Sequence, residues 1–365
     1  MPATFPHFRT LMNRRRLMAL LATGMAAPSR SAWAELPTLK ELERAARAEG
    51  RIHSLGMPDS WANWRDTWAE LRRLHGLVHS DRNMTSGEEI ALLEAEGKAA
   101  TVDIGDVGFE FGAIARSRGV TRPYKPSSWA EIPEWAKDPD GHWALAYTGT
   151  IAFMVNTRRL PKPPRSWQAL FKGQYRVLLG EVGPSAQANA AVLAAAVALG
   201  GNETQLQPAL AQFAPMHREG RLLYIYPGPV PMNQNLADVH VMWDFVALAM
   251  RKRVPNPGDY EVFIPEDGSI TSGYTTIINK HAPHPNAAML TREYIFSDAG
   301  QANLARGHAR PIRVDSLELT PDVARGLIDA SQYKASRALH PAIWAWEAKK
   351  LTKLWQAEVL ARASK

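Results

Sequence analysis

Cysteine is absent from the 365 residues of this chain. Without cysteine the protein has no disulfide framework, so its stability must come from its hydrophobic core. Beyond residue 34 the sequence also lacks any apolar stretch long enough to span a bilayer, and it lacks internal repeats and low-complexity tracts. The remaining length of about 330 residues is enough for two lobes, each with a core of its own.

Common enzyme signatures are missing as well. The sequence has no H-E-x-x-H motif, no Walker loop and no dinucleotide fingerprint. The segment Gly183-Pro184-Ser185-Ala186-Gln187 lacks the final glycine of a nucleophile elbow. We therefore expect a protein that is not an enzyme and that needs neither a cofactor nor a metal ion.

The first 34 residues contain five arginines and no acidic residue, the composition of an export signal. Arginines at 14–16 precede an apolar run over 17–27, and Ala32-Trp33-Ala34 is a small-residue cleavage site. The apolar run is about half of the ~20 residues that cross a bilayer, which favours a cleaved signal over a retained anchor. The arginine pair leaves the twin-arginine route open beside general secretion. We expect a periplasmic protein.

Removal of this signal also changes the charge balance. The whole chain has 43 basic and 36 acidic residues, and without the five arginines of the signal 38 basic residues remain. The mature protein is therefore close to neutral, which gives no support for nucleic-acid binding.

Helices and short apolar strands alternate along the first part of the chain. Helices are predicted to end at Gly50, Gly76 and Gly97, because glycine follows each periodic segment. Ser86-Gly87-Glu88-Glu89 is interpreted as a capping box that opens the third helix. Strands are expected over 51–55 and 102–107. This alternation is typical of an α/β layered domain.

The second part continues the same pattern after a surface excursion rich in proline and tryptophan over 123–140. Strands are predicted over 143–156, 177–179, 222–226, 261–264 and 270–279, and helices over 185–199, 286–296, 298–306 and 341–361.

Several short motifs, taken in their order and spacing, resemble the type II periplasmic solute-binding proteins, in the branch with receptors for polyamines, ferric iron, thiamine, phosphonates and sugar phosphates. The resemblance runs from about Leu39 to about Arg313. The motifs are Asp106-Val107-Gly108, Lys137-Asp138-Pro139-Asp140-Gly141-His142-Trp143, Asn156, Arg165-Ser166-Trp167-Gln168-Ala169-Leu170, Ser185-Ala186-Gln187-Ala188, Met242-Trp243-Asp244, His284-Pro285-Asn286-Ala287-Ala288 and Ser297-Asp298-Ala299-Gly300-Gln301.

The resemblance implies an α/β fold of two lobes, joined by two crossing hinge strands, with a ligand cleft between the lobes. The expected organisation is a signal peptide over 1–34, the first part of lobe 1 over 35–149, lobe 2 over 150–272, the return to lobe 1 over 273–330, and a C-terminal helical segment over 331–365.

The function implied by the resemblance is that of the periplasmic substrate-binding component of an ABC importer. Its partners would be a small-molecule solute and a membrane permease, with no nucleic acid, and we expect a monomer. A polyamine-type cation receptor of the same fold stays open as an alternative. An exported hydrolase on the same scaffold is the alternative from another class.

Candidate ligand-binding residues are those where strands end and helices begin, because helix N-termini there offer unpaired N–H groups. They are Asp59, Ser60, Trp61, Asp106, Phe109, Tyr147, Thr150, Ser185, Ala186, Gln187, Asn233, Trp243, Asp244 and Tyr274. Asp59 and Ser60 equally suit capping of the next helix. Ser185 is an expected N-cap, and Trp243 equally suits core packing.

The candidate cleft combines two kinds of chemistry. Three acids, Asp59, Asp106 and Asp244, lie among aromatic residues and suit a cationic or polyhydroxylated group. The predicted helix N-terminus at Ser185 suits a phosphate, phosphonate or carboxylate. The sequence therefore favours a small polar organic solute with an anionic group, by a narrow margin over a plain polyamine.

Overall fold

The computed structural model describes residues 38–225 and 232–361, and the predicted signal peptide lies outside these ranges. Among the residues it describes, no helix has the length and apolar character that crossing a membrane requires.

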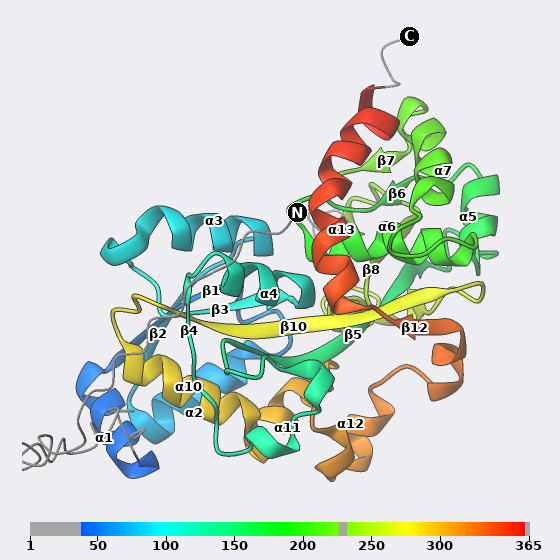
Figure 1. The fold of residues 1–365 in the computed structure, drawn as a ribbon. Coiled ribbons are helices and arrows are strands. Elements are labelled where there is room, and N and C mark those ends of the chain that lie inside the picture. The colour runs from blue at the N-terminus through cyan, green and yellow to red at the C-terminus, as the bar shows by residue number, and fades with distance from the viewer. Residues whose placement is uncertain (1–37, 226–231, 362–365) are drawn as a thin grey trace, which may run out of the picture. The chain divides into compact units, whose positions relative to one another are not determined.

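One group of elements forms what we call the first lobe (Figure 1). Its strands are β1 (Arg51–Leu55), β2 (Val78–Arg82), β3 (Ile104–Gly108), β4 (Thr121–Arg122), β10 (Ser269–Asn279) and the first half of β5 (Trp143–Asn156). The three strands β2, β1 and β3 are parallel, and β10 runs antiparallel between β3 and β5.

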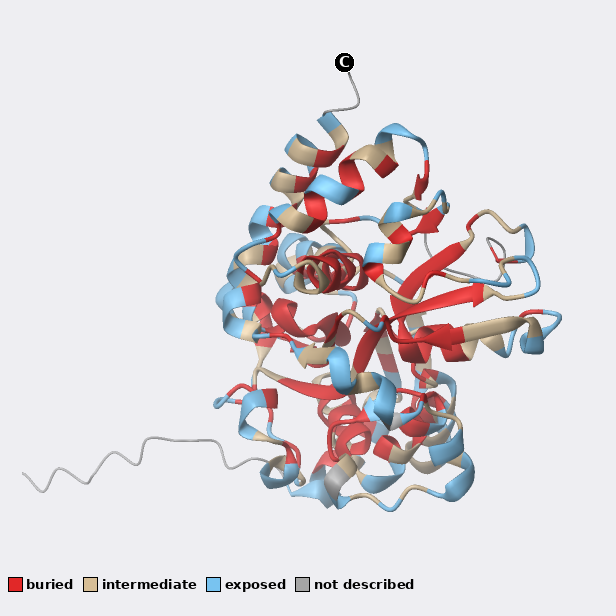
Figure 2. Ribbon diagram, turned by 90° about the vertical axis from the view of Figure 1, so that its right-hand side faces the viewer, coloured by how far each residue is buried: buried red, intermediate tan, exposed pale blue. Residues whose placement is uncertain are grey.

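Helices cover both faces of this sheet. The helices α3 (Ser86–Glu96) and α4 (Phe109–Ser117) lie on one face, and α1 (Leu39–Glu49), α2 (Trp64–His75), α10 (Pro285–Phe296) and α11 (Asp298–Arg306) lie on the other (Figure 1). Figure 2 shows the buried residues concentrated along the strands and on the helix faces that turn toward them. This is a layered α/β arrangement with the sheet as its core.

A second group of elements, the second lobe, is built on the other half of β5. Its strands are β6 (Val177–Leu178), β7 (Leu222–Leu223), β8 (Val239–Trp243) and β9 (Tyr260–Phe263), and its helices are α5 (Trp167–Lys172), α6 (Ala186–Ala198), α7 (Gln207–Arg218) and α9 (Asp244–Arg251). The helix α6 is buried from Ala186 to Ala196, as expected for a helix that is apolar all round.

The strand β5 changes its partners in the middle. Up to Thr150 it pairs with β10, and from Ile151 onward it pairs with β8 and then also with β9. The hydroxyls of Thr150 and Thr271 lie 2.7 Å apart on the two crossing strands. The long strands β5 and β10 therefore connect the two lobes.

The C-terminal segment returns along both lobes. A two-residue strand β11 (Arg310–Pro311) pairs with β5, α12 (Pro321–Arg325) follows, and β12 (Ser336–Ala338) pairs in parallel with β10. The last helix, α13 (Pro341–Trp355), packs on α4 of the first lobe and continues into a π-helical turn, 356–360, that packs on α7 of the second.

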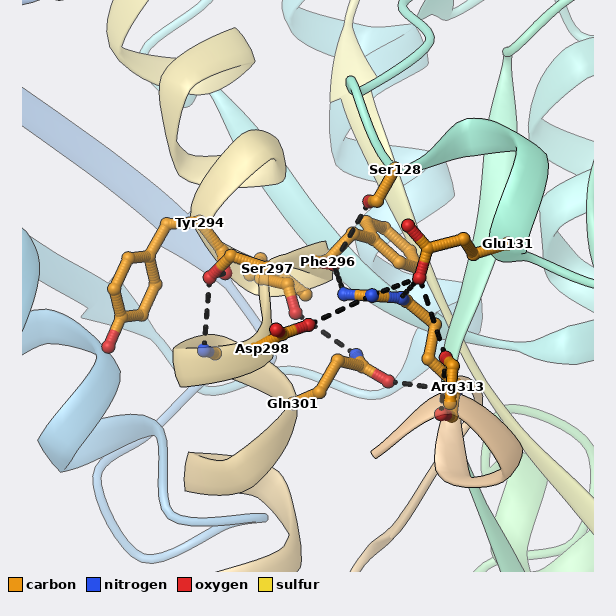
Figure 3. A network of polar contacts seen from close by, with 11 residues as sticks. Ser128, Glu131, Tyr294, Phe296, Ser297, Asp298, Gln301 and Arg313 are labelled. Atoms are coloured by element: carbon orange, nitrogen blue, oxygen red, sulfur yellow. Dashed lines mark hydrogen bonds and ion pairs between the residues drawn. The ribbon is translucent and has the colours of Figure 1, made fainter. Parts of the chain in front are cut away.

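A polar network around Arg313 holds this return segment on the first lobe (Figure 3). The buried guanidinium of Arg313 pairs with Glu131 and with Asp298, at 2.9 Å for the latter, and it donates to the Phe296 carbonyl over 2.5 Å. The Arg313 N–H also donates to Gln301 Oε1 over 3.1 Å. The charge is thus fully paired and hydrogen-bonded, the condition under which a buried arginine is tolerated.

Most predicted elements are confirmed, and the differences are local. The capping box that opens α3 joins Thr85 to Glu88, whose carboxylate accepts from the Thr85 N–H over 2.9 Å, so the box begins one residue before the predicted position. The sequence patterns missed β2, α4, α5 and α7. The predicted capping of the long helix by Ser185 is confirmed, since its hydroxyl accepts from the Ala188 N–H.

Candidate functional site

A small cavity of about 40 Å³ lies where the two lobes meet. Pockets for organic ligands measure about 300–1,000 Å³, and this one corresponds to a few water molecules, so the lobes lie close together. Its lining residues are Gly56, Trp61, Asn83, Met84, Thr85, Ser86, Glu89, Asp106 and Tyr274 of the first lobe and Ser185, Ala186 and Gln187 of the second.

A larger cavity, about 380 Å³, lies elsewhere. Its lining includes Arg165, Phe263 and Lys334, and it contains no residue from the ends of β1 and β3 or from the start of α6. We place the candidate site at the smaller cavity, because only that one is lined by both lobes at the carboxyl ends of parallel strands.

Two helix N-termini, one from each lobe, reach the smaller cavity. The first turn of α3 contributes Ser86, and the first turn of α6 contributes Ala186 and Gln187. The first N–H groups of a helix have no partner within the helix, and they stand at the positive end of its dipole. The start of α6 therefore suits an anionic group, whereas α3 is capped by Thr85 and has Glu88 and Glu89 in its first turn.

The lobes touch directly beside the cavity. The Gly87 N–H donates to the Pro184 carbonyl over 3.3 Å, from the first lobe to the second. A Cβ placed on Gly108 would lie 2.4 Å from the Cβ of Ala186. Only glycine at position 108 permits this approach, because real Cβ atoms do not come so close.

Two buried carboxylates, Glu89 and Asp106, belong to the lining. Burial raises the pKa of Glu89 well above its ordinary value, and the charges of Asp106 and Asp81 raise it further. Burial likewise raises the pKa of Asp106 well above its ordinary value, against the hydrogen bond from Tyr147, which lowers it. These groups favour the neutral form unless a cation approaches them.

A chain of aromatic side chains supports Asp106 from behind. The Trp61 indole N–H donates to the Tyr147 hydroxyl over 2.7 Å, and that hydroxyl donates to Asp106 Oδ2 over 2.5 Å. The Trp243 indole N–H donates to the Tyr274 hydroxyl over 3.0 Å. Trp61 and Tyr274 line the cavity, whereas Tyr147 and Trp243 are buried behind it.

Asp244 lies at the crossing of the strands. Its carboxylate accepts from the N–H groups of Thr150 (3.0 Å) and Phe245 (2.8 Å) and from the Tyr333 hydroxyl (2.6 Å). Burial raises the pKa of Asp244, and these three donors lower it. The carboxylate is therefore engaged in tying the hinge strand to α9 and to the C-terminal segment.

The other predicted residues lie apart from the cavity lining. Asp59 and Ser60 are exposed in the turn before α2, and Asn233 is exposed next to the undescribed residues 226–231. Phe109 is buried against Trp143, with ring centroids 5.6 Å apart.

Six of the fourteen predicted residues thus share the cavity lining, namely Trp61, Asp106, Ser185, Ala186, Gln187 and Tyr274. A binding role for each of the fourteen stays a prediction. The Gln187 side chain accepts from the Trp243 N–H over 3.1 Å, which fixes the start of α6 against the end of β8.

Sequence reasoning did not single out Glu89 or the segment 83–86 that precedes α3. Glu89 was interpreted only as part of a capping box. A signal was present in the spacing, because Glu89 lies one position before Ile90 and four before Leu93, on the buried side of α3. Among the described residues, no group of three or more His, Cys, Asp and Glu side chains is arranged to hold a metal ion.

Solved structures with the same fold are periplasmic binding proteins. AfuA from Actinobacillus pleuropneumoniae is 17% identical with a TM-score of 0.70, and the match covers 85% of this chain and 98% of AfuA. P5PA is 16% identical with a TM-score of 0.71, over 85% of this chain and 99% of P5PA. AgtB from A. tumefaciens R10 is 17% identical with a TM-score of 0.70, and the match covers 85% of this chain and 98% of AgtB. The predicted two-lobed α/β fold is therefore confirmed.

No curated protein matches the sequence. A family model described as bacterial extracellular solute-binding protein matches residues 101–334, which is more than half of the chain. This match includes the second lobe, both crossing strands and the return to the first lobe. The proteins of this family bind solutes outside the cytoplasm and are receptors rather than enzymes, and the chain belongs to the family of bacterial extracellular solute-binding proteins.

Proposed function

We propose that this chain is the periplasmic substrate-binding subunit of an ABC importer and that it binds a small polar organic solute with an anionic group between its lobes. The cavity carries this proposal, because residues of both lobes line it and the N-terminus of α6 stands at its edge. An anionic solute held by both lobes would link them.

The solutes in two structures of the same fold agree with an anionic ligand. AfuA is described with fructose-6-phosphate bound, and AgtB is described in complex with agropinic acid. One is a phosphate ester and the other an organic acid. At 17% identity these structures share the fold of this chain, and the choice of an anionic ligand rests on the residues of the cavity.

Hinge closure supplies the mechanism. The small cavity and the contacts between Gly87 and Pro184 describe lobes that lie together, so a solute must enter while they are apart. A solute that contacts both lobes stabilises the closed form, and a permease can distinguish that form from the open one.

The lobe boundaries form part of the proposal. We place lobe 1 at 35–149 and 273–330, and lobe 2 at 150–272. The change of partner along β5 between Thr150 and Ile151 supports the first crossing. For export, we propose cleavage before Glu35, and the intact mass of the secreted protein tests this.

A thermal-shift screen tests the binding proposal. The screen contains amino acids, alkyl phosphonates, phosphate esters and polyamines. A ligand at a hundred times its Kd adds about 2.7 kcal/mol to the free energy of unfolding, which a melting curve detects readily. We expect stabilisation by at least one compound with an anionic group. Stabilisation by polyamines alone would support the cation receptor and contradict the anionic site.

A further inference from the structure

Three carboxylates of the first lobe lie close together, and the charge of one of them, Asp81, raises the pKa of the other two. The three are Asp81 near the end of β2, Glu89 on α3 and Asp106 in the middle of β3. Within residues 38–225 and 232–361, no lysine, arginine or histidine lowers the pKa of any of the three. Glu89 and Asp106 are buried, and Asp81 is partly buried.

Among the three carboxylates, Glu89 occupies a space that neighbouring glycines leave open for it. Its side chain is 1% exposed and lies against the ends of β1 and β3. A Cβ on Gly56 would lie 2.3 Å from Glu89 Oε1, and a Cβ on Gly105 would lie 2.7 Å from Oε2. Gly56 also has a φ of +65°, which other residues adopt only under strain. Two glycines thus leave the room that this carboxylate occupies.

One oxygen of Glu89 lacks a hydrogen bond within the described part of the chain. Among the described residues, Glu89 Oε2 has no hydrogen-bond partner, although its exposure is almost nil and the residue belongs to the cavity lining. Asp106 Oδ1 is likewise without a hydrogen bond there. Buried carboxylate oxygens are costly to leave unpaired, so groups of this kind mark positions where a ligand donates.

The aromatic part of the lining points to the same kind of ligand. Trp61 and Tyr274 line the cavity and pack edge to face with ring centroids 5.3 Å apart. Aromatic faces attract ammonium groups, and neither lysine nor arginine is among the residues of the lining.

We propose that Glu89, together with Asp106, binds an ammonium group of the solute, so that the ligand is a zwitterion such as an amino acid or an aminoalkyl phosphonate. This inference rests on the proposed function, which places the anionic end of the same solute at the N-terminus of α6. The ammonium group donates to Glu89 Oε2 and to Asp106, while the anionic end accepts from the N–H groups of Ala186 and Gln187.

This arrangement links ligand charge to closure. Glu89 and Asp106 belong to the first lobe, and Ala186 and Gln187 belong to the second. A zwitterion therefore bridges the lobes with an opposite charge at each end. An acid without an amine leaves the carboxylates unpaired beside it, and a diamine brings a cation to the N-terminus of α6.

The experiment compares Glu89→Gln with wild type in isothermal titration calorimetry and thermal shift. The probes are 2-aminoethylphosphonate, α-amino acids and ω-amino acids of two to four carbons, each with the matching acid that lacks the amine, and 1,4-diaminobutane. The matched control is Glu110→Gln, which neutralises another fully buried glutamate of the first lobe that lies outside the cavity lining.

We expect at least one amine-bearing acid to bind wild type and Glu110→Gln alike, its amine-free analogue to bind much more weakly, and Glu89→Gln to lose about ten- to a hundredfold in affinity. Equal binding of the amine-free acids, unchanged affinity in Glu89→Gln, or no binding by any amine overturns the inference.

The two proposals fail in different ways. If amine-free acids bind as well as amino acids do, the ammonium site is wrong and the anionic site stands. If 1,4-diaminobutane alone binds and Glu89→Gln abolishes its binding, the ammonium site stands and the anionic site is wrong.

Discussion

Gly108, the last residue of β3, faces Ala186, the first residue of α6, so closely that a Cβ on the glycine would lie 2.4 Å from the Cβ of the alanine. The contact joins the first lobe to the second directly beside the cavity. The distance between the lobes at this point is therefore set by the absence of a side chain at position 108.

Replacement of Gly108 by alanine should weaken ligand binding without unfolding the protein. The backbone at Gly108 has φ −52° and ψ 151°, which alanine adopts freely, so the separated lobes should tolerate the methyl group. In the closed form the overlap costs about 1–3 kcal/mol, equivalent to a loss of about ten- to a hundredfold in affinity. Calorimetric titration with a ligand found in the screen measures this loss.

Gly258→Ala is the control for this variant, because an added Cβ there meets no atom within 4 Å and the glycine does not have a positive φ. Its affinity should equal that of wild type. Unchanged affinity in Gly108→Ala would show that the lobes do not approach this closely in the ligand complex.

Tyr147 is expected to matter more for stability than its aromatic ring alone suggests. Its hydroxyl donates to Asp106 over 2.5 Å and accepts from the Trp61 indole over 2.7 Å. Tyr147→Phe removes the hydrogen bond to Asp106 and the one from Trp61. This loss should lower the free energy of unfolding by about 1–3 kcal/mol. Urea unfolding measures the loss.

Tyr260→Phe serves as the comparison, since Tyr260 is only partly buried and packs at the edge of the core. The Tyr260→Phe variant should lose less than about 0.5 kcal/mol in its free energy of unfolding. Equal effects of the two substitutions would mean that the Trp61–Tyr147–Asp106 chain does not contribute to stability.

The sequence predicted those elements whose ends carry their own signals. The strand β1 was predicted with its observed bounds because Gly50 and Gly56 enclose it, and both glycines have positive φ. The helix α6 was predicted because Ser185 caps it and the alanines continue it. In such places the local chemistry and the tertiary structure agree.

Two of the missed helices, α7 and α4, lack such signals, whereas α5 has a cap at Ser166 that was overlooked in the sequence. The helix α7 contains Pro215 in its last turn, a residue that argues against a helix, and burial of Leu210 and Phe213 outweighs that local preference. The helix α4 follows β3 without a side-chain cap and contains Gly112. Tertiary packing determines both elements, and a single sequence does not show it.

The residues of the candidate site also divide into those with a local sequence signal and those without one. Strand ends and helix starts pointed to Asp106, Ser185 and Gln187, which line the cavity. The sequence did not predict a binding role for Glu89, because a glutamate near a helix start is ordinarily exposed and caps the helix. Its burial depends on Gly56 and Gly105, which are distant in sequence and leave the space for it.

The C-terminal helix should be essential for stability, although the family match ends at residue 334. Trp355 at the end of α13 is 3% exposed, and its ring lies 5.5 Å from that of Phe213 on α7. Trp355→Ala removes a large buried ring and should cost about 3–5 kcal/mol, measured by urea unfolding. Trp346→Ala is the control, because Trp346 on the same helix is 63% exposed. A similar loss in both variants would contradict this packing role.

Stability should depend on pH through Glu110, a buried carboxyl group at the start of α4. Burial raises the pKa of Glu110 from its ordinary value of 4.5 to about 7, although a hydrogen bond from its own N–H lowers it. An acid whose pKa is raised by folding binds its proton more tightly in the folded state. Its contribution to stability is complete below about pH 4.5 and is lost as the pH rises through about 7.

Glu110→Gln removes this titration and keeps the shape of the side chain. The variant should match wild type near pH 4 and should be more stable by about 3 kcal/mol near pH 8, because each unit of pKa shift corresponds to about 1.4 kcal/mol. Urea unfolding from pH 4 to pH 8 measures the difference between the two proteins, in which the other carboxyl groups cancel. Glu318→Gln, at an exposed position, should show no such trend. A difference between Glu110→Gln and wild type that stays constant over this range would show that Glu110 does not titrate there, and that the carboxyl group reaches water when the lobes move.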